Sequence, residues 1–276
     1  MPRPHPKPMP VVECHVTDMG VDGLGVARVD EKVVFVEGGM PGDRAQVQIY
    51  RNKGRYAQGR VVELLEPSSH RVSPVCQHFG TCGGCKWQNM DYPTQLVYKT
   101  KQVHDALTRI GGLSLEGVQA EPALPAHAIY RFRNKLEFTF TDRRWLTREE
   151  LLQSQEQSAT SDASTHGFPG TGLGFHLSGR FERILHIETC YLMDEVADLI
   201  RNTFYRQAVA MNLSFYSIRT RQGYLRNLML RNTVDGQWMV LLSVSEDKPE
   251  ILLPYLEALR PQLPQVDQWL YTVNTK

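Results

Sequence analysis

Three closely spaced cysteines constrain this chain more than any other feature of its sequence. Cys76, Cys82 and Cys85 lie within ten residues, and only Gly83-Gly84 separates the last two. Glycine reaches positive φ without a Cβ clash, so we expect this segment to fold tightly around something small. A fourth thiol, Cys190, lies far downstream. Four thiolates are the usual ligand set of a tetrahedral zinc ion or of an iron–sulfur cluster.

The composition favours a metal site over disulfide bonds. The chain has 276 residues, enough for about two domains, and five cysteines, an odd number. Residues 1–10 are proline-rich and lack the apolar core of a secretory signal. No stretch approaches the roughly 18 apolar residues of a membrane span. We therefore expect a cytoplasmic protein without membrane contact, where the reducing environment disfavours disulfides.

The N-terminal part of the chain predicts a small closed β-barrel. Residues 1–10 are expected to be a disordered tail, and residues 11–70 contain short apolar runs separated by glycine turns. The runs Val33–Val36, Val47–Tyr50 and Gly59–Leu64 are among five predicted strands. Closure of such short strands into a barrel would remove exposed sheet edges.

Residues 71–276 are predicted to form a second domain. A helix is expected from the N-cap Asp91 to Gly111-Gly112, with an apolar face that packs inward. Further on, alternating apolar residues at 136, 138 and 140 indicate a strand, and the polar stretch at about 150–166 indicates a surface insertion. The remaining predicted elements are helices after Cys190 and at 250–260, and strands at Leu225–Arg231, Gln237–Val244 and Trp269–Val273.

The spacing of the thiols leaves the identity of the metal open. Zinc modules usually contain two close Cys/His pairs, whereas here there is one tight pair, one thiol six residues before it and one remote thiol. This arrangement is more typical of ferredoxin-like clusters. The alternatives are zinc, with His78 as a further candidate ligand, and unliganded buried cysteine, which would suit Cys14.

Two basic runs indicate local contact with RNA, because the net charge of +1 predicts no partner. The first run lies within residues 44–71 and the second within 131–148, and both include aromatic residues. Cations can pair with phosphates while bases stack on the rings. The alternative for either run is a solvated strand face. The candidate RNA contacts from these runs are Arg51, Lys53, Arg55, Tyr56, Arg131, Arg133 and Lys135.

Three sequence elements together resemble the RNA uracil-C5 methyltransferases. They are Cys76-x5-Cys82-Gly-Gly-Cys85-x2-Gln88, the run Tyr130–Lys135 with its Arg-Asn-Lys end, and Leu225-Arg226-Asn227. Among these enzymes, the bacterial branch that modifies 23S ribosomal RNA is the most similar. The resemblance implies an α/β protein with an OB-like, RNA-binding TRAM barrel and a central α+β domain. It also implies dependence on S-adenosylmethionine, a monomer, an RNA contact at Asn134, and a [4Fe–4S] cluster bound by Cys76, Cys82, Cys85 and Cys190.

The sequence departs from this family in one respect. Family members continue into a Rossmann-like domain with a glycine-rich S-adenosylmethionine pocket, a nucleophilic cysteine and an acidic base. We find none of these here, and we assign no catalytic and no cofactor-binding residue. We therefore expect a chain that is truncated before the methyltransferase domain, recognises RNA and is inactive alone. The alternatives are a stand-alone RNA-binding module with a structural metal, and a zinc-binding interaction protein that does not contact RNA.

Overall fold

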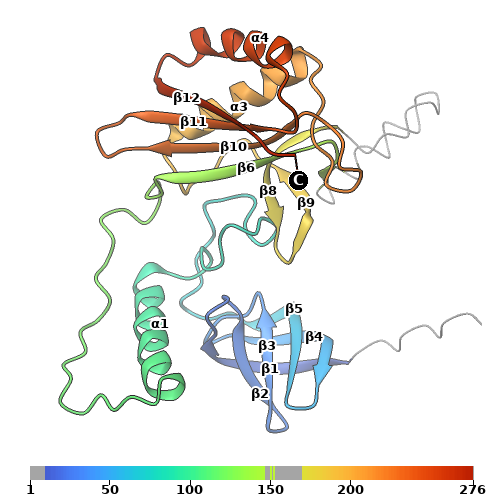
Figure 1. Cartoon of the computed structure of the whole chain (residues 1–276). Helices are drawn as coiled ribbons and strands as arrows, with labels where there is room; N and C mark the ends of the chain where they lie inside the picture. The colour runs from blue at the N-terminus through green and yellow to red at the C-terminus, as the bar shows by residue number, and fades with distance from the viewer. Residues whose placement is uncertain (1–9, 147–149, 151, 153–169, 276) are drawn as a thin grey trace, which may run out of the picture. The chain divides into compact units, whose positions relative to one another are not determined.

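The computed structural model describes residues 10–146, 150, 152 and 170–275 (Figure 1). The predicted tail, apart from residue 10, and the predicted insertion, apart from residues 150 and 152, lie outside the described residues. The chain divides into two compact units. The barrel unit comprises residues 1–75 and 86–127, and the sheet unit comprises residues 76–85 and 128–276. The run that contains Cys76, Cys82 and Cys85 thus belongs to the same unit as Cys190, whereas the predicted boundary lay at residue 70.

The barrel unit contains the predicted closed barrel of five strands. Small and β-branched apolar side chains point inward from these strands, as in Val34 and Val36 of one strand and Ala45 and Val47 of another. A parallel pair between β3 and β5 completes a ring in the order β1-β2-β3-β5-β4. The strands are β1 (Val11–Met19), β2 (Gly25–Val29), β3 (Lys32–Glu37), β4 (Arg44–Lys53) and β5 (Tyr56–Glu66).

Helix α1 (Tyr92–Asp105) begins where the sequence predicts. The Asp91 carboxylate caps its first turn by accepting the Thr94 N–H at 2.8 Å. A π-helical turn, η1 (Ala106–Ile110), continues the helix to Gly111. The start of the helix follows from local capping chemistry, which can be recognised in the sequence.

The predicted apolar face of α1 is wrong. Val103 and Ile110, which the periodicity placed toward a core, are 61% and 87% exposed. The helix instead contacts the barrel through the opposite face, where Lys101 Nζ lies 2.8 Å from an Asp18 carboxylate oxygen. Tyr98 packs on this side against a cluster of three buried methionines. The apolar periodicity predicted the helix but not its buried face, because the contact between α1 and the barrel is made by polar and aromatic side chains.

The sheet unit is built on one seven-stranded sheet with the order β12-β11-β10-β6-β8-β9-β7. Strand β6 shows the predicted alternation, since Leu136, Phe138 and Phe140 are buried. The strands are β6 (Lys135–Thr141), β7 (Arg144–Trp145), β8 (Gly172–Leu177), β9 (Arg180–His186), β10 (Leu225–Asn232), β11 (Trp238–Val244) and β12 (Val266–Val273).

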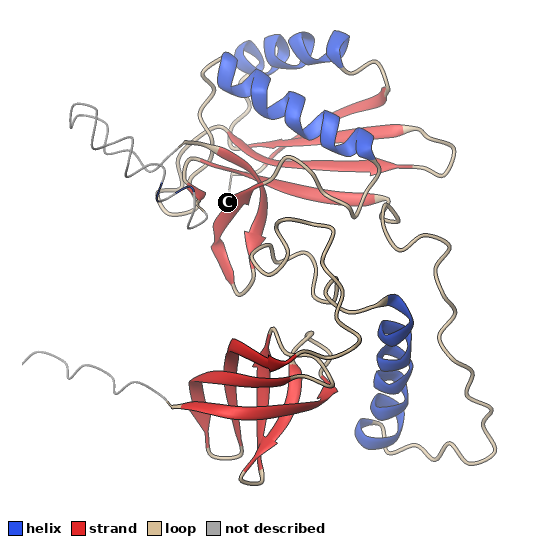
Figure 2. Cartoon of the chain, turned by 180° about the vertical axis from the view of Figure 1, so that it is seen from behind, coloured by secondary structure: helices blue, strands red, loops and turns tan. Residues whose placement is uncertain are grey.

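Two helices, α3 (Glu195–Ala210) and α4 (Pro249–Leu259), lie on one face of this sheet (Figure 2). A short turn, η2 (Arg260–Gln262), connects α4 to β12. Ile200 and Phe204 of α3 and Tyr255 of α4 are buried in the same core as the inward side chains of β6. No helix in the described ranges is long and apolar enough to span a membrane.

The strand pairing makes the sheet unit α+β, the class that the resemblance implies for the central domain, rather than α/β, the class that it implies for the whole chain. Four of its six strand pairs are antiparallel, and only β11–β12 and β7–β9 are parallel. An α/β fold places helical crossovers on both faces of a mostly parallel sheet. Hairpins connect β8 to β9 and β10 to β11, and α3 and α4 cover one face of the sheet, so the unit is α+β.

Candidate functional site

The cysteine run folds as a series of tight turns. The Phe79 N–H donates to the Cys76 carbonyl at 3.0 Å, and the Cys82 N–H donates to the His78 carbonyl at 2.9 Å. The Gly83 N–H then donates to the His176 carbonyl of β8 at 2.9 Å, which attaches the run to the β8–β9 hairpin. These bonds bring Cys82 and Cys85 against the core of the sheet unit.

The glycines of this run act differently from the prediction. Among them, Gly80 has positive φ, at 85°, whereas Gly83 and Gly84 do not. A Cβ on Gly83 would lie 2.9 Å from the His176 carbonyl oxygen. Glycine is therefore required at position 83 for close backbone approach to β8 rather than for a left-handed turn.

Cys190 comes to the same region from the segment between β9 and α3. It is 7% exposed and belongs to the buried core against which Cys82 and Cys85 pack. Its backbone N–H donates to Asp198 Oδ1 of α3 at 2.9 Å, and its carbonyl accepts from Arg131 at 2.9 Å. Both peptide groups of the residue are therefore fixed by charged side chains.

Burial and the charge of the other three predicted ligands both act on the Cys82 thiol. Burial raises the pKa of Cys82 to about 11, although the Gly84 N–H, 3.4 Å from its sulfur, opposes this. Negative charge on Cys85, Cys190 and Cys76 raises the pKa further. Cys82, Cys85 and Cys190 thus meet at one core from two distant segments, and Cys76 is near enough to influence the pKa of Cys82. Cys14 lies apart from them, in the barrel core.

The arrangement is not that of a closed single-ion site. Among residues 10–146, 150, 152 and 170–275, no three His, Cys, Asp or Glu side chains are placed to bind one metal ion. A cubane cluster separates its four thiolates more widely than a single ion does, because the irons and sulfides lie between them. Four thiols are, in their chemistry alone, the usual donor set of such a cluster.

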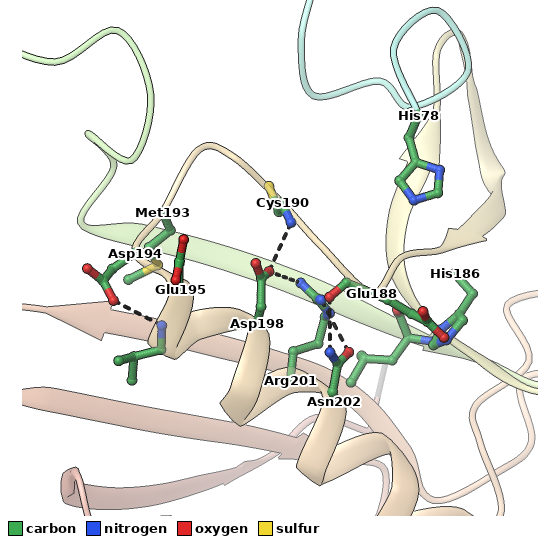
Figure 3. A network of polar contacts seen from close by, with 12 residues as sticks. His78, His186, Glu188, Cys190, Met193, Asp194, Glu195, Asp198, Arg201 and Asn202 are labelled. Atoms are coloured by element: carbon green, nitrogen blue, oxygen red, sulfur yellow. Dashed lines mark hydrogen bonds and ion pairs between the residues drawn. The ribbon is translucent and has the colours of Figure 1, made fainter. Parts of the chain in front are cut away.

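Two histidines of the sheet unit, His78 and His186, lie in the same region as Cys190 (Figure 3). Burial lowers the pKa of His78, the alternative zinc ligand, and the charge of Arg201 lowers it further. Burial also lowers the pKa of His186; its hydrogen bond with Leu173 opposes this, and the charge of Arg144 adds to it. Both imidazoles are therefore held in the neutral form.

A buried charged network lies beside Cys190 (Figure 3). The Arg201 side chain is fully buried, and its guanidinium donates to Asp198 Oδ1 at 2.9 Å and to Asn202 at 3.2 Å. The same guanidinium lies 5.2 Å from the centroid of the Phe138 ring. Sequence reasoning missed Asp198 and Arg201. The i,i+3 spacing of these two residues on a helix could have indicated an ion pair, but the same spacing is equally typical of an ion pair on the protein surface.

The first set of candidate RNA contacts lies together at one hairpin of the barrel unit. Arg51, Lys53 and Arg55 are exposed on the end of β4 and in the turn to β5. Lys53 pairs with Tyr56 across the hairpin. Tyr56 packs edge-on against Phe35, with ring centroids 5.7 Å apart. The hairpin therefore presents three cations beside a supported aromatic ring.

The second set divides into two groups. Arg133, Asn134 and Lys135 are exposed where the chain enters β6. Arg131 is instead half-buried, and its guanidinium bonds to the Cys190 segment and to Asp198 at 3.2 Å. The structure brings the first three together on a surface, whereas the Arg131 side chain points into the unit.

The sequence was compared with known protein families and with curated relatives. Residues 10–62 match the TRAM domain, which covers the barrel except for the end of β5. An uncharacterized RNA methyltransferase of Bacteroides thetaiotaomicron is 38% identical, over 94% of this chain and 55% of its own length. Proteins with the same description from Porphyromonas gingivalis and Chlorobaculum tepidum are 39% and 35% identical. This chain spans about half the length of these curated relatives.

Among solved structures, a Pyrococcus abyssi tRNA (uracil-54, C5)-methyltransferase in complex with S-adenosyl-L-homocysteine is similar in fold. The TM-score is 0.60 at 21% identity, and the alignment covers 95% of this chain and 52% of that chain. This result overturns the expectation of a chain cut off before methyltransferase structure begins, because nearly all of its residues align within a methyltransferase. We therefore withdraw the predictions of a missing domain and of an inactive fragment. The chain contains a TRAM domain and is similar along most of its length to proteins named RNA methyltransferases.

Proposed function

We propose that this chain acts in the S-adenosylmethionine-dependent methylation of uracil C5 in 23S ribosomal RNA. The observation that carries the proposal is the alignment of 94% of the chain with a protein named RNA methyltransferase. The structural neighbour, which acts on uracil C5 and contains S-adenosyl-L-homocysteine, supports the reaction and the cofactor. The 23S target rests on the resemblance of the cysteine run to the bacterial branch.

In this proposal, residues 11–70 form the RNA-binding barrel. Arg51, Lys53 and Arg55 would pair with phosphates, and the Tyr56 ring would stack on an unpaired base. The exposed segment Arg133–Lys135 supplies a second cationic contact in the sheet unit. An enzyme that modifies a base must take it out of its stack. Contacts in both units suit that task, because each unit can bind a single-stranded stretch of the RNA.

Residues 71–276 would carry the [4Fe–4S] cluster, with Cys76, Cys82, Cys85 and Cys190 as ligands. The fit rests on the donor chemistry of four reduced thiols that influence one another electrostatically. A bound cluster would cross-link the cysteine run to the Cys190 segment. We further propose that the protein is a cytoplasmic monomer, because the fold as described supplies both RNA contacts and all four thiols from one chain.

Deletion of the gene in its source organism tests the proposed reaction. We expect one 5-methyluridine to disappear from 23S ribosomal RNA, as measured by mass spectrometry of RNA fragments, and to return when the gene is restored. Unchanged 23S methylation would overturn the target. Loss of 5-methyluridine from transfer RNA instead would keep the reaction and reject the ribosomal substrate.

Anaerobic purification tests the cluster. We expect a coloured protein with about four iron atoms and as many sulfides per chain. The Cys190→Ser variant should lose iron, and the Cys14→Ser variant should retain it, because Cys14 lies in the barrel core away from the other thiols. A colourless protein with one zinc ion per chain would overturn the cluster and support the zinc alternative.

A further inference from the structure

The carboxylate of Asp198 is the centre of the network beside Cys190. Its Oδ1 accepts the Cys190 N–H at 2.9 Å and a guanidinium N–H of Arg201 at 2.9 Å. Its Oδ2 accepts from Arg131 at 3.2 Å. The side chain is only 13% exposed, so water contributes little to its solvation. One carboxylate thus links a backbone group of Cys190 to two arginines from different parts of the sheet unit.

Arg131 holds the other side of the Cys190 segment. One nitrogen of its guanidinium donates to the carbonyls of Cys190 and Met193, each at 2.9 Å. The group also lies 5.0 Å from the centroid of the Tyr191 ring. The Arg131 backbone has φ of 59°, a conformation that non-glycine residues adopt at some cost in energy. The surrounding contacts must outweigh this cost, which indicates that the position of Arg131 is strongly determined.

Arg201 supports Asp198 from the inside of the unit. Its side chain is fully buried, and its Nε has no hydrogen-bond partner within the described ranges. A buried guanidinium is expensive to desolvate, and an apolar side chain at this position would pack against Phe138 without that cost. The α+β fold alone therefore does not require an arginine here. The neighbouring thiols offer a reason for it, because thiolates bring negative charge into the same buried region.

We propose that Asp198, oriented by Arg131 and Arg201, is a positioning residue that sets Cys190 in its ligand conformation before a cluster is bound. This inference rests on the proposed role of Cys190 as a cluster ligand. The two arginines also offset the negative charge that four thiolates gather around the cluster. Asp198 fixes the N–H of Cys190 and Arg131 fixes its carbonyl. The backbone of Cys190, and with it the direction of its Cα–Cβ bond, is therefore set by the protein rather than by the metal.

The decisive variant is Asp198→Asn. Asparagine has the shape of aspartate, but it carries no charge and its amide N–H groups cannot accept hydrogen bonds from the Cys190 N–H or from the two arginines. We expect the rate of Cys190 alkylation by iodoacetamide in the metal-free chain to rise about tenfold or more, because a hydrogen bond to a charged group is lost. Mass spectrometry of peptides gives this rate for each cysteine separately. Cys14 is the internal reference: a general loss of folding would raise its rate too, whereas loss of positioning would not.

The matched control is Asp194→Asn. Asp194 belongs to the same helix terminus and caps α3 through the Val196 N–H at 2.9 Å, but it does not contact Cys190. This variant removes the same charge and should leave the Cys190 rate near that of the unaltered chain. If Asp198→Asn does not fold, Arg131→Lys replaces it, because lysine keeps the charge but cannot reproduce the set of guanidinium bonds. We expect it to raise the Cys190 rate while that of Cys14 stays unchanged.

Iron binding separates this inference from the proposed function. After anaerobic reconstitution with ferrous iron and sulfide, Asp198→Asn should release iron to a chelator faster than the unaltered chain does. If the unaltered chain binds no iron, the cluster proposal fails, and the alkylation result still decides whether Asp198 positions Cys190. An unchanged Cys190 alkylation rate in both Asp198→Asn and Arg131→Lys would overturn the positioning role, whatever the iron content.

Discussion

Replacing Asp43 with alanine should destabilise the barrel unit by about 3 kcal/mol, the lower part of the range for breaking a buried ion pair. Asp43 is fully buried and accepts four hydrogen bonds. Two come from the Met40 and Ser68 N–H groups, at 2.7 and 2.9 Å. The other two come from the Arg71 guanidinium, at 2.8 and 2.6 Å.

The magnitude follows from what the alanine variant leaves behind. Two backbone N–H groups lose their acceptor, and each such loss costs about 1–3 kcal/mol when the group stays buried. The Arg71 side chain is 19% exposed, so water recovers part of its solvation. Its bond to the Gly38 carbonyl, at 2.7 Å, is also retained. These two effects place the expected loss at the lower end of the range.

Hydrogen exchange measured by mass spectrometry during urea unfolding gives the stability of the barrel unit separately from that of the sheet unit. Glu13→Ala is the matched control, because Glu13 also pairs with an arginine, Arg44, but both side chains are about half exposed. Such an exposed pair contributes little to the free energy of unfolding, because water screens it. A loss in Asp43→Ala no larger than that of the control would refute the assignment of Asp43 as a buried anchor.

Three further predictions concern the RNA contacts, the pH dependence of stability and the start of α1. Replacing Arg51, Lys53 and Arg55 with alanine should reduce the slope of log affinity against log salt by about 2 for single-stranded RNA, whereas lysine at the two arginine positions should preserve the slope; an unchanged slope in the alanine variant would reject the hairpin as a phosphate contact. Because burial lowers the pKa of His186, the unfolded chain binds that proton more readily, so the free energy of unfolding should fall as the pH drops below about 6.5. Urea titrations should show a flatter pH dependence for His186→Gln, and an identical curve would contradict this. Asp91→Ala should cost the barrel unit about 1 kcal/mol through loss of the helix cap, and an effect within error of zero by the same exchange measurement would contradict the capping role.

The parts of the fold that could be predicted from the sequence are those set by local chemistry. Apolar alternation and glycine turns predicted the barrel, and the capping residue predicted the start of α1. The α+β class of the sheet unit did not come from such local signals, because it was implied only by the resemblance to a family. Helices and strands alternate along its sequence much as in an α/β protein, and only the strand pairing shows that β6 lies between β8 and β10.

The thiol site, too, could be predicted from local sequence only in part. The spacing of Cys76, Cys82 and Cys85 made them candidate metal ligands at once, because clustered thiols in a chain without a secretory signal are typical of metal sites. The sequence gives no local reason to join Cys190 to them, and that link came from resemblance to a family. In the structure the link is physical: the Gly83 N–H bonds to the β8–β9 hairpin, and the chain that leaves β9 leads directly to Cys190.

Arg131 illustrates why charge alone does not identify function. In the sequence it is one cation in a basic run, and its neighbours Arg133 and Lys135 are exposed as expected for RNA contacts. Its own side chain turns inward because three acceptors lie there, namely two backbone carbonyls and the Asp198 carboxylate. A run of cations on one strand can thus serve two purposes. The exposed members are available to phosphate, and the buried member fixes the segment that carries Cys190. If both proposals hold, substitutions at Arg133 and Lys135 would weaken RNA binding without loss of iron, whereas a substitution at Arg131 would loosen the iron first.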